Sequence, residues 1–277
     1  MRQPVQTAYT FVDGNVCQLE LPPPDVQVLG DIRWGAFDEV GTPAYWRVQA
    51  WHHERLGTYS DLRLGRGLSE ELTACLLGGY GMPADLALAA YRRLRSEGLI
   101  RSGVKQEVLE GVLREPFFIR GGSRHYRFAR QKARYLSRCL ELLDGFEPDG
   151  RSDVGLRDSL AEFPGIGPKT ASWIVRNYRD SDSVAILDVH IVRAGRMIGL
   201  FNADADPQRH YFRLERQFLA LAKALDVRAA LLDAMIWDQM RRMSHALPQT
   251  GQPAKTRLRS RLADHGGASG GEMRMSV

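Results

Sequence analysis

Two residues of the chain, Lys169 and Asp188, carry an amine and a carboxylate, and they stand 19 residues apart. A neutral lysine amine is a nucleophile that can attack an electrophilic carbon and form a Schiff base. An ionised carboxylate stabilises positive charge that develops in a transition state more than it stabilises the ground state. The surroundings must supply the neutral form of the amine, because a free lysine is almost fully protonated near neutral pH.

The lysine follows a glycine-rich turn, and residues 160–171 are Leu-Ala-Glu-Phe-Pro-Gly-Ile-Gly-Pro-Lys-Thr-Ala. We predict two helices joined by a turn in which Gly165 and Gly167 permit positive φ and let the backbone approach another surface. Pro168 suits the first turn of the second helix. The open N-terminus of that helix, with Thr170 in its first turn, attracts anions through its free N–H groups and its dipole. A DNA phosphate is the anion that such a hairpin would hold.

The aspartate lies in the segment Ile186-Leu187-Asp188-Val189-His190-Ile191-Val192-Arg193, after a helix and a polar loop. An aspartate that opens a helix can be a simple N-cap. A lone histidine such as His190 is more often a packing or capping residue than a functional one. The hairpin also has a second interpretation, because hairpins of this kind occur in polymerases, ligases and nucleases as DNA grips without chemistry.

Taken in register, the two segments resemble the helix-hairpin-helix (HhH-GPD) DNA glycosylase superfamily. The matching residues are Pro164-Gly165-Ile166-Gly167 with Lys169, where Phe163 replaces the usual leucine, and Leu187-Asp188-Val189-His190, where Leu187 replaces valine. The resemblance implies that Lys169 is the nucleophile, that Asp188 faces the deoxyribose, and that His190 contacts the DNA backbone. We therefore expect double-stranded DNA containing a modified base as the partner. The net charge of +5 and the pI near 9.2 favour such a polyanion.

A target base inside a duplex must be flipped into a pocket, and a side chain must fill the gap. The resemblance places the filling residue in the loop over 78–81, where Tyr80 is the candidate. The basic segment over 120–134 resembles a helix start of the same family, and its Arg127 is expected near the DNA. A solvated helix face explains these charges equally well.

Further expectations concern cofactors and the base pocket. In similar proteins the hairpin binds a monovalent cation through main-chain carbonyls, here those of Ala161, Phe163 and Ile166. We expect no iron–sulfur cluster and no other cofactor, because Cys17, Cys75 and Cys139 form no CxxC pair. The missing cluster favours the 8-oxoguanine DNA glycosylase/AP lyase branch. Its C-terminal helix, here over 229–243, contributes to the base pocket, for which the candidates are Trp237, Asp238 and Gln239.

The elements that must position these groups are mainly α-helical. We predict a two-lobed helical HhH-GPD fold with an irregular or mixed N-terminal segment over 1–68, a glycosylase domain with the active-site cleft over 69–248, and a flexible basic tail over 249–277. Apolar spacing predicts helices that begin near residue 69 and cover 85–97, 105–113, 125–143, 155–163, 168–178, 188–198, 207–225 and 229–243. With no leader pattern and no long apolar run, we expect a location in the cytoplasm, associated with the nucleoid in a bacterium, and no membrane contact. We also expect a monomer.

The expected function is that of a bifunctional DNA glycosylase/AP lyase of base excision repair that removes an oxidised purine, with 8-oxoguanine as the first choice. Two alternatives stay open. One is a monofunctional glycosylase for another modified base, in which Asp188 activates water. The other is a helix-hairpin-helix DNA-binding module without catalysis.

Overall fold

The computed structural model describes residues 5–59, 61–79 and 81–246, and only the backbone of residues 244–246. Within this part the chain is mainly helical, as expected, with three small antiparallel hairpins. The helices are α1 (Pro43–Arg55), α2 (Leu68–Leu77), α3 (Ala84–Ser96), α4 (Gln106–Arg114), α5 (Ala129–Leu142), α6 (Asp153–Ala161), α7 (Pro168–Arg179), α8 (Val189–Ile198), α9 (Pro207–Ala224) and α10 (Ala229–Ala246). The strands are β1 (Gln6–Val12), β2 (Asn15–Leu21), β3 (Gln27–Leu29), β4 (Ile32–Arg33), β5 (Phe117–Ile119) and β6 (Gly122–Arg124).

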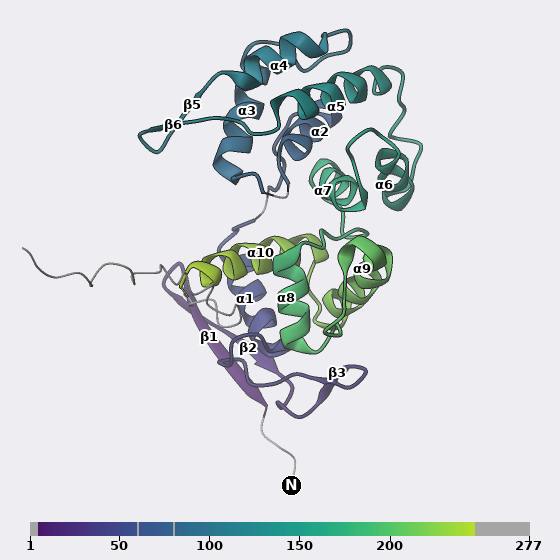
Figure 1. Cartoon of the computed structure of the whole chain (residues 1–277). Helices are drawn as coiled ribbons and strands as arrows, with labels where there is room; N and C mark the ends of the chain where they lie inside the picture. The colour runs from purple at the N-terminus through teal and green to yellow at the C-terminus, as the bar shows by residue number, and fades with distance from the viewer. Residues whose placement is uncertain (1–4, 60, 80, 247–277) are drawn as a thin grey trace, which may run out of the picture.

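The chain forms two lobes, each with its own apolar core (Figure 1). One lobe contains α2 to α7 together with the β5–β6 hairpin. The other joins the N-terminal hairpins and α1 to the C-terminal helices α8, α9 and α10 (Figure 1). The chain therefore leaves the second lobe after α1 and returns to it between α7 and α8. Both chemically interesting segments lie at this return.

The N-terminal segment has more regular structure than its sequence suggests. The β1–β2 hairpin turns at Asp13 and Gly14, both at positive φ, which suits the twist of two paired strands. Helix α1 was not predicted, although Thr42 caps it and Pro43 opens it. The buried positions of α1 recur almost every second residue, because the second lobe surrounds the helix, and this hides the helical period.

The other predicted helices are present with small shifts at their ends. The largest shift is in α5, which begins at Ala129 rather than at His125, because Gly122–Arg124 pair with Phe117–Ile119 as strands. The N-terminal segment supplies Ala8, Leu21 and Trp46 to the same core as α8 to α10. The domain boundaries at 68/69 and 248/249 stay predictions, and the predicted tail lies outside the described residues. No helix of the described part is long and apolar enough to cross a membrane.

Candidate active site

The hairpin between α6 and α7 shows why its two glycines differ. Gly165 has φ +76°, and a Cβ atom there would stand 2.2 Å from the ring of Tyr135 on α5. Gly167 has φ −97° and ψ 178°, and a Cβ atom there would meet nothing within 4 Å. The expectation of positive φ is therefore right at Gly165 and wrong at Gly167. The surface that Gly165 approaches is α5 of the same chain, whereas Gly167 leaves the N-terminus of α7 open.

Lys169 stands in the first turn of α7, directly after Pro168, and its side chain is half-buried. Phe163 and Ile166 are buried and fix the hairpin, and the Ile166 N–H donates to the Phe163 carbonyl at 3.0 Å. The positive end of a helix dipole disfavours a positive charge placed beside it. Thr170 follows in the same turn and is half-buried too.

A second amine lies near Lys169, and no role was predicted for it. Lys132 of α5 is half-buried, and its Nζ donates to the Leu76 carbonyl at 2.6 Å. Burial lowers the pKa of Lys132, and the positive charge of Lys169 lowers it further. The helical spacing could have indicated that Lys132 is partly buried, because Ala129, Ala133 and Leu136 form the buried face of α5 and Lys132 stands between them.

Asp188 is the N-cap of α8, as its simpler interpretation predicted. Its Oδ1 accepts the N–H groups of His190 at 2.8 Å and Ile191 at 3.0 Å. No other hydrogen bond to this carboxylate comes from the described residues. The cap therefore uses one oxygen and leaves Oδ2 available for a substrate, so capping and catalysis are compatible. His190 is half-buried and meets the edge of Trp237 with ring centroids 6.3 Å apart.

A buried carboxylate joins the two candidate segments. Glu215 Oε1 on α9 accepts the Ser172 hydroxyl at 3.1 Å and the Ala185 N–H at 3.0 Å. Ser172 lies three residues after Lys169, and Ala185 lies three residues before Asp188. The hairpin helix and the segment leading to α8 thus meet at a single oxygen atom.

The predicted gap-filling loop contacts α7 and the residues just before α5. A Cβ atom at Gly78 would stand 3.1 Å from the ring of Trp173 on α7, and the Arg127 guanidinium donates to the Gly81 carbonyl. Arg127 is exposed. Its expected contact with DNA stays a prediction. Tyr80 lies outside the described residues.

The three base-pocket candidates are half-buried on α10, and each contacts a different neighbour. Asp238 pairs with Arg242 at 2.6 Å and accepts the Tyr59 hydroxyl at 3.1 Å. Gln239 accepts the Tyr45 hydroxyl at 2.9 Å. Trp237 packs against His190, which brings it close to the start of α8. Of the three, Trp237 is the one whose contact connects it to the Asp188 segment.

The predicted cation ligands lie at the end of α6 and in the turn. The Phe163 carbonyl already accepts one N–H, and a carbonyl oxygen has a second lone pair, so the set of Ala161, Phe163 and Ile166 is compatible with a bound cation and stays a prediction. Cys17 lies on β2, Cys75 on α2 and Cys139 on α5. Among the described residues, no group of three His, Cys, Asp or Glu side chains is arranged to hold a metal.

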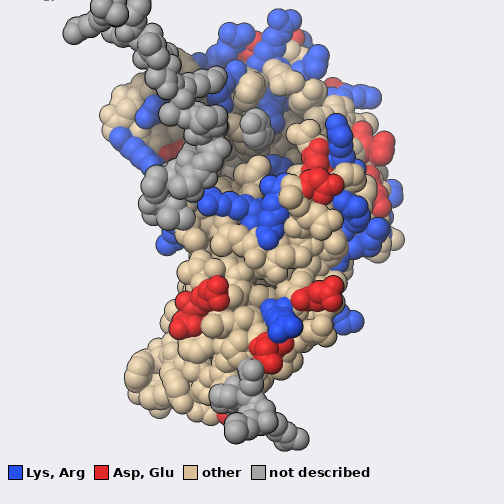
Figure 2. All heavy atoms as spheres, turned by 60° about the horizontal axis from the view of Figure 1, so that its bottom comes forward, with Lys and Arg blue, Asp and Glu red and all other residues tan. Residues whose placement is uncertain are grey.

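A basic surface adjoins the hairpin. Residues 116–140 contain seven Lys or Arg residues and no Asp or Glu. Six of the seven, all arginines, are exposed: Arg120, Arg124, Arg127, Arg130, Arg134 and Arg138. The face drawn in Figure 2 shows most of its Lys and Arg in the upper half of the view, whereas the lower half is mostly tan with scattered red and blue patches. Since Tyr135 packs against Gly165, the basic segment and the open hairpin lie side by side.

Comparison with known proteins gives consistent results. The sequence model of the family described as "8-oxoguanine DNA glycosylase" (Ogg-HhH) matches residues 54–227. An 8-oxoguanine DNA glycosylase/AP lyase of Metallosphaera sedula is 33% identical over 121 residues, which are 40% of this chain and 57% of that protein. This chain thus matches little more than half the length of that relative.

Two solved structures have a similar fold. The 8-oxoguanine DNA glycosylase of Thermotoga maritima superposes with a TM-score of 0.50 at 23% identity, over 70% of this chain and 88% of that one. A trapped covalent intermediate of endonuclease III with DNA superposes with a TM-score of 0.52 at 19% identity, over 71% of this chain and 85% of that one. At these identities the two structures establish an endonuclease III-like fold.

Proposed function

Because the chain belongs to the 8-oxoguanine DNA glycosylase (Ogg-HhH) family, we propose that it is a DNA glycosylase/AP lyase that removes 8-oxoguanine from double-stranded DNA in base excision repair. One observation carries the proposal. Ser172 and Ala185, each three residues from a candidate catalytic group, donate to the same carboxylate oxygen of Glu215. This contact holds the Lys169 helix against the segment that ends at Asp188.

The proposed reaction uses the two groups in different ways. The neutral Lys169 amine attacks C1′ as the bond from C1′ to N9 of the base breaks, and the base leaves with the bonding electron pair and takes up a proton. The attached nitrogen then loses a proton, and the sugar ring opens as the bond from C1′ to O4′ breaks and O4′ takes up a proton, which gives a Schiff base. Removal of a proton from C2′ then expels the 3′ phosphate by β-elimination. The negative Asp188 stabilises the positive charge on the sugar while the base departs.

DNA would be held by the hairpin and by the basic segment beside it. The open N-terminus of α7 offers N–H groups to one phosphate, since no described residue lies within 4 Å of where a Gly167 Cβ atom would stand. The exposed arginines of α5 and the loop before it supply attraction that does not depend on sequence. Hydrogen bonds to phosphates fix the register of a protein on the duplex, while the flipped base is recognised in the pocket.

Borohydride trapping tests the proposal. A duplex with one 8-oxoguanine and a matched duplex with guanine are incubated with the protein and sodium borohydride, which reduces a Schiff base to a stable adduct. We expect an adduct with the first duplex only, and we expect Lys169→Gln to abolish it. Lys223→Gln, at an exposed lysine on α9, is the matched control and should trap normally.

The outcomes separate the alternatives. Release of 8-oxoguanine without any adduct would indicate that Asp188 activates water and that Lys169 is not the nucleophile. Binding of both duplexes without base release would indicate a DNA-binding module. Either result would overturn the proposed reaction.

A further inference from the structure

The segment that carries Asp188 back into the second lobe has no regular structure, and buried side chains hold the three residues that precede Asp188. The Ala185 N–H donates to Glu215 at 3.0 Å, and the Ile186 N–H donates to Asp233 at 3.2 Å. The Tyr211 hydroxyl accepts the Leu187 N–H at 3.4 Å and donates to the Ala185 carbonyl at 2.6 Å. Three consecutive N–H groups before Asp188 are therefore each bound by a side chain from α9 or α10.

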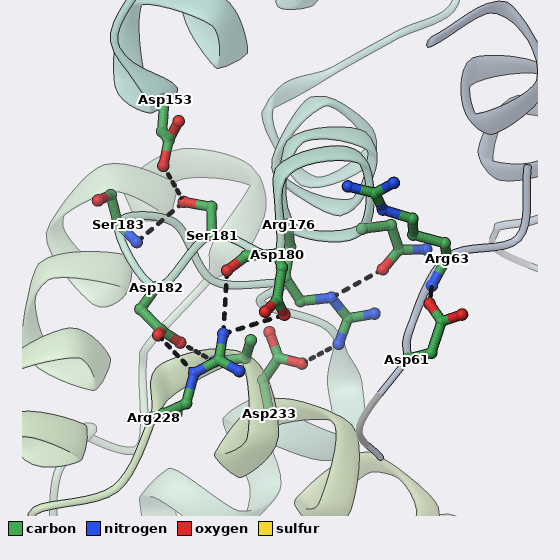
Figure 3. A network of polar contacts seen from close by, with 12 residues as sticks. Asp61, Arg63, Asp153, Arg176, Asp180, Ser181, Asp182, Ser183, Arg228 and Asp233 are labelled. Carbon is green, nitrogen blue, oxygen red and sulfur yellow. Dashed lines mark hydrogen bonds and ion pairs between the residues drawn. The ribbon is translucent and has the colours of Figure 1, made fainter. Parts of the chain in front are cut away.

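The same two carboxylates bind the hairpin helices. Glu215 Oε2 pairs with Arg157 of α6 at 2.6 Å, while its Oε1 also accepts the Ser172 hydroxyl of α7. Asp233 Oδ1 pairs with Arg176 of α7, as Figure 3 shows. Glu215 and Asp233 are only 4% and 2% exposed. Each carboxylate thus contacts a side chain of the Lys169 helix and also accepts a backbone N–H group of the Asp188 segment.

Stability alone does not explain such groups. Burying an ion pair has a large desolvation cost, and well-packed apolar residues are often at least as stabilising. What a buried carboxylate with several fixed donors does impose is a single relative position of the elements that donate to it. Here these elements are the helix that starts with Lys169 and the segment that ends with Asp188.

We propose that Glu215 and Asp233 are positioning residues for the reaction proposed above, on which this inference rests. They hold the Asp188 carboxylate at a fixed place relative to the Lys169 amine, and Tyr211 supports the same segment. Neither carboxylate contacts the substrate. Because a displacement of about 1 Å can cost about 10²-fold in rate, loss of these contacts should slow base release without weakening DNA binding.

A double-mutant cycle tests the inference. We compare Asp233→Asn and Glu215→Gln, each alone and combined with Asp188→Asn, in single-turnover base release from an 8-oxoguanine duplex. Each change alone should slow release by about 10- to 100-fold with an unchanged Kd for the duplex. In the Asp188→Asn background the same changes should add less than about threefold, because a residue that acts through Asp188 has nothing left to position.

A second readout separates positioning from a general loss of structure. Borohydride trapping on a duplex that already carries an abasic site needs the amine but no departure of a base, so it should change by less than about threefold. A merely structural defect would lower base release, trapping and the fraction of active protein together. Asp182→Asn is the matched control, because Asp182 is an exposed carboxylate on the same crossing segment that pairs with Arg228 at 2.8 Å (Figure 3).

A gentler pair of variants covers the case in which the carboxylate variants fail to fold. Tyr211→Phe removes only the hydroxyl from the Asp188 segment and should show the same pattern. Tyr91→Phe removes the hydroxyl of another buried tyrosine, bonded to Glu70 at 3.0 Å in the other lobe, and should leave both rates unchanged. Additive effects with Asp188→Asn, or a Tyr211→Phe protein with wild-type base release, would overturn this inference but not the proposed function. A wild-type protein that releases no base would overturn the proposed function and the inference with it.

Discussion

At the scale of single residues, the geometry of Asp188 is compatible with two roles that the sequence presented as alternatives. It caps α8 through Oδ1, and its Oδ2 has no hydrogen bond from the described residues. Capping fixes the rotamer of the side chain, so the free oxygen has a defined direction. A residue that must stabilise charge in a transition state gains from such preorganisation, because no reorientation is needed during the reaction.

Two substitutions at this position separate its roles. Asn caps a helix about as well as Asp, whereas Ala does not, and loss of a cap costs about 1 kcal/mol. We expect Asp188→Asn to keep the wild-type free energy of unfolding and Asp188→Ala to lose about 1 kcal/mol in urea titrations. Both should slow base release by about 10²-fold or more, since both remove the negative charge. Full activity of Asp188→Asn would leave Asp188 as a cap only.

Asp233 gives a prediction on pH. Burial raises the pKa of Asp233 to about 6, and the Arg176 guanidinium opposes this shift only in part. The folded protein then holds this proton more tightly than the unfolded chain, so the contribution to stability is present below pH 4 and is lost as the pH rises from about 4 to 6.

The comparison with Asp233→Asn isolates this effect, because the variant has no titrating group there. The stability of the wild-type protein minus that of the variant should fall between pH 4 and pH 7 by no more than about 3 kcal/mol. Urea unfolding of both proteins across this range measures the difference. A difference that stays flat or rises with pH would contradict the assigned shift.

At the scale of elements, the hairpin depends on two glycines for different reasons. The fold requires a glycine at position 165, because φ is positive there and the ring of Tyr135 leaves no room for a Cβ atom. A Cβ atom at Gly167 would have no described residue within 4 Å. The sequence marked both positions by residue type, which identifies a turn. Only the backbone angles and the neighbouring helix reveal which glycine is needed for folding and which one leaves room for a ligand.

A pair of alanine substitutions tests this difference. Gly165→Ala should lower the free energy of unfolding by at least about 1–2 kcal/mol, the cost of a left-handed conformation for a side chain, with the clash added to it. Gly167→Ala should change stability by less than about 0.5 kcal/mol and weaken duplex binding by about tenfold, because its methyl group faces the proposed phosphate. Thermal unfolding and fluorescence anisotropy measure the two effects. Equal loss of stability in both variants would contradict the distinction.

At the scale of the whole molecule, the candidate catalytic residues lie at the junction of the two lobes, and a basic surface lies beside it. The hairpin belongs to the lobe of α2 to α7, and Asp188 opens the first helix of the other lobe. The basic segment extends from the β5–β6 hairpin along α5, next to the helical hairpin. A duplex bound along this surface would therefore present its sugars to the junction.

The salt dependence of duplex binding tests this arrangement. Each phosphate contact contributes about 0.9 to the slope of log Kd against log salt concentration. We expect Arg130→Ala to reduce the slope by about 1 and to weaken binding equally for damaged and undamaged duplexes. The matched control is Arg216→Ala, which removes an exposed arginine of α9 in the other lobe and should leave the slope unchanged. A slope that is lower in Arg216→Ala and unchanged in Arg130→Ala would place the DNA on a different face.

The sequence by itself determined the helical class, the hairpin and the residues Lys169 and Asp188, because turn chemistry, helix starts and motif spacing are local properties of the chain. It did not reveal α1, whose alternating burial follows from being enclosed by distant elements. Glu215 and Asp233 were equally hidden. A charged residue within an apolar helical face acquires a role only when folding brings its partner from another part of the chain, as Glu215 does with Ser172 and Ala185. Tertiary structure alone decided this, since a buried charge is tolerated only where several distant donors converge on it.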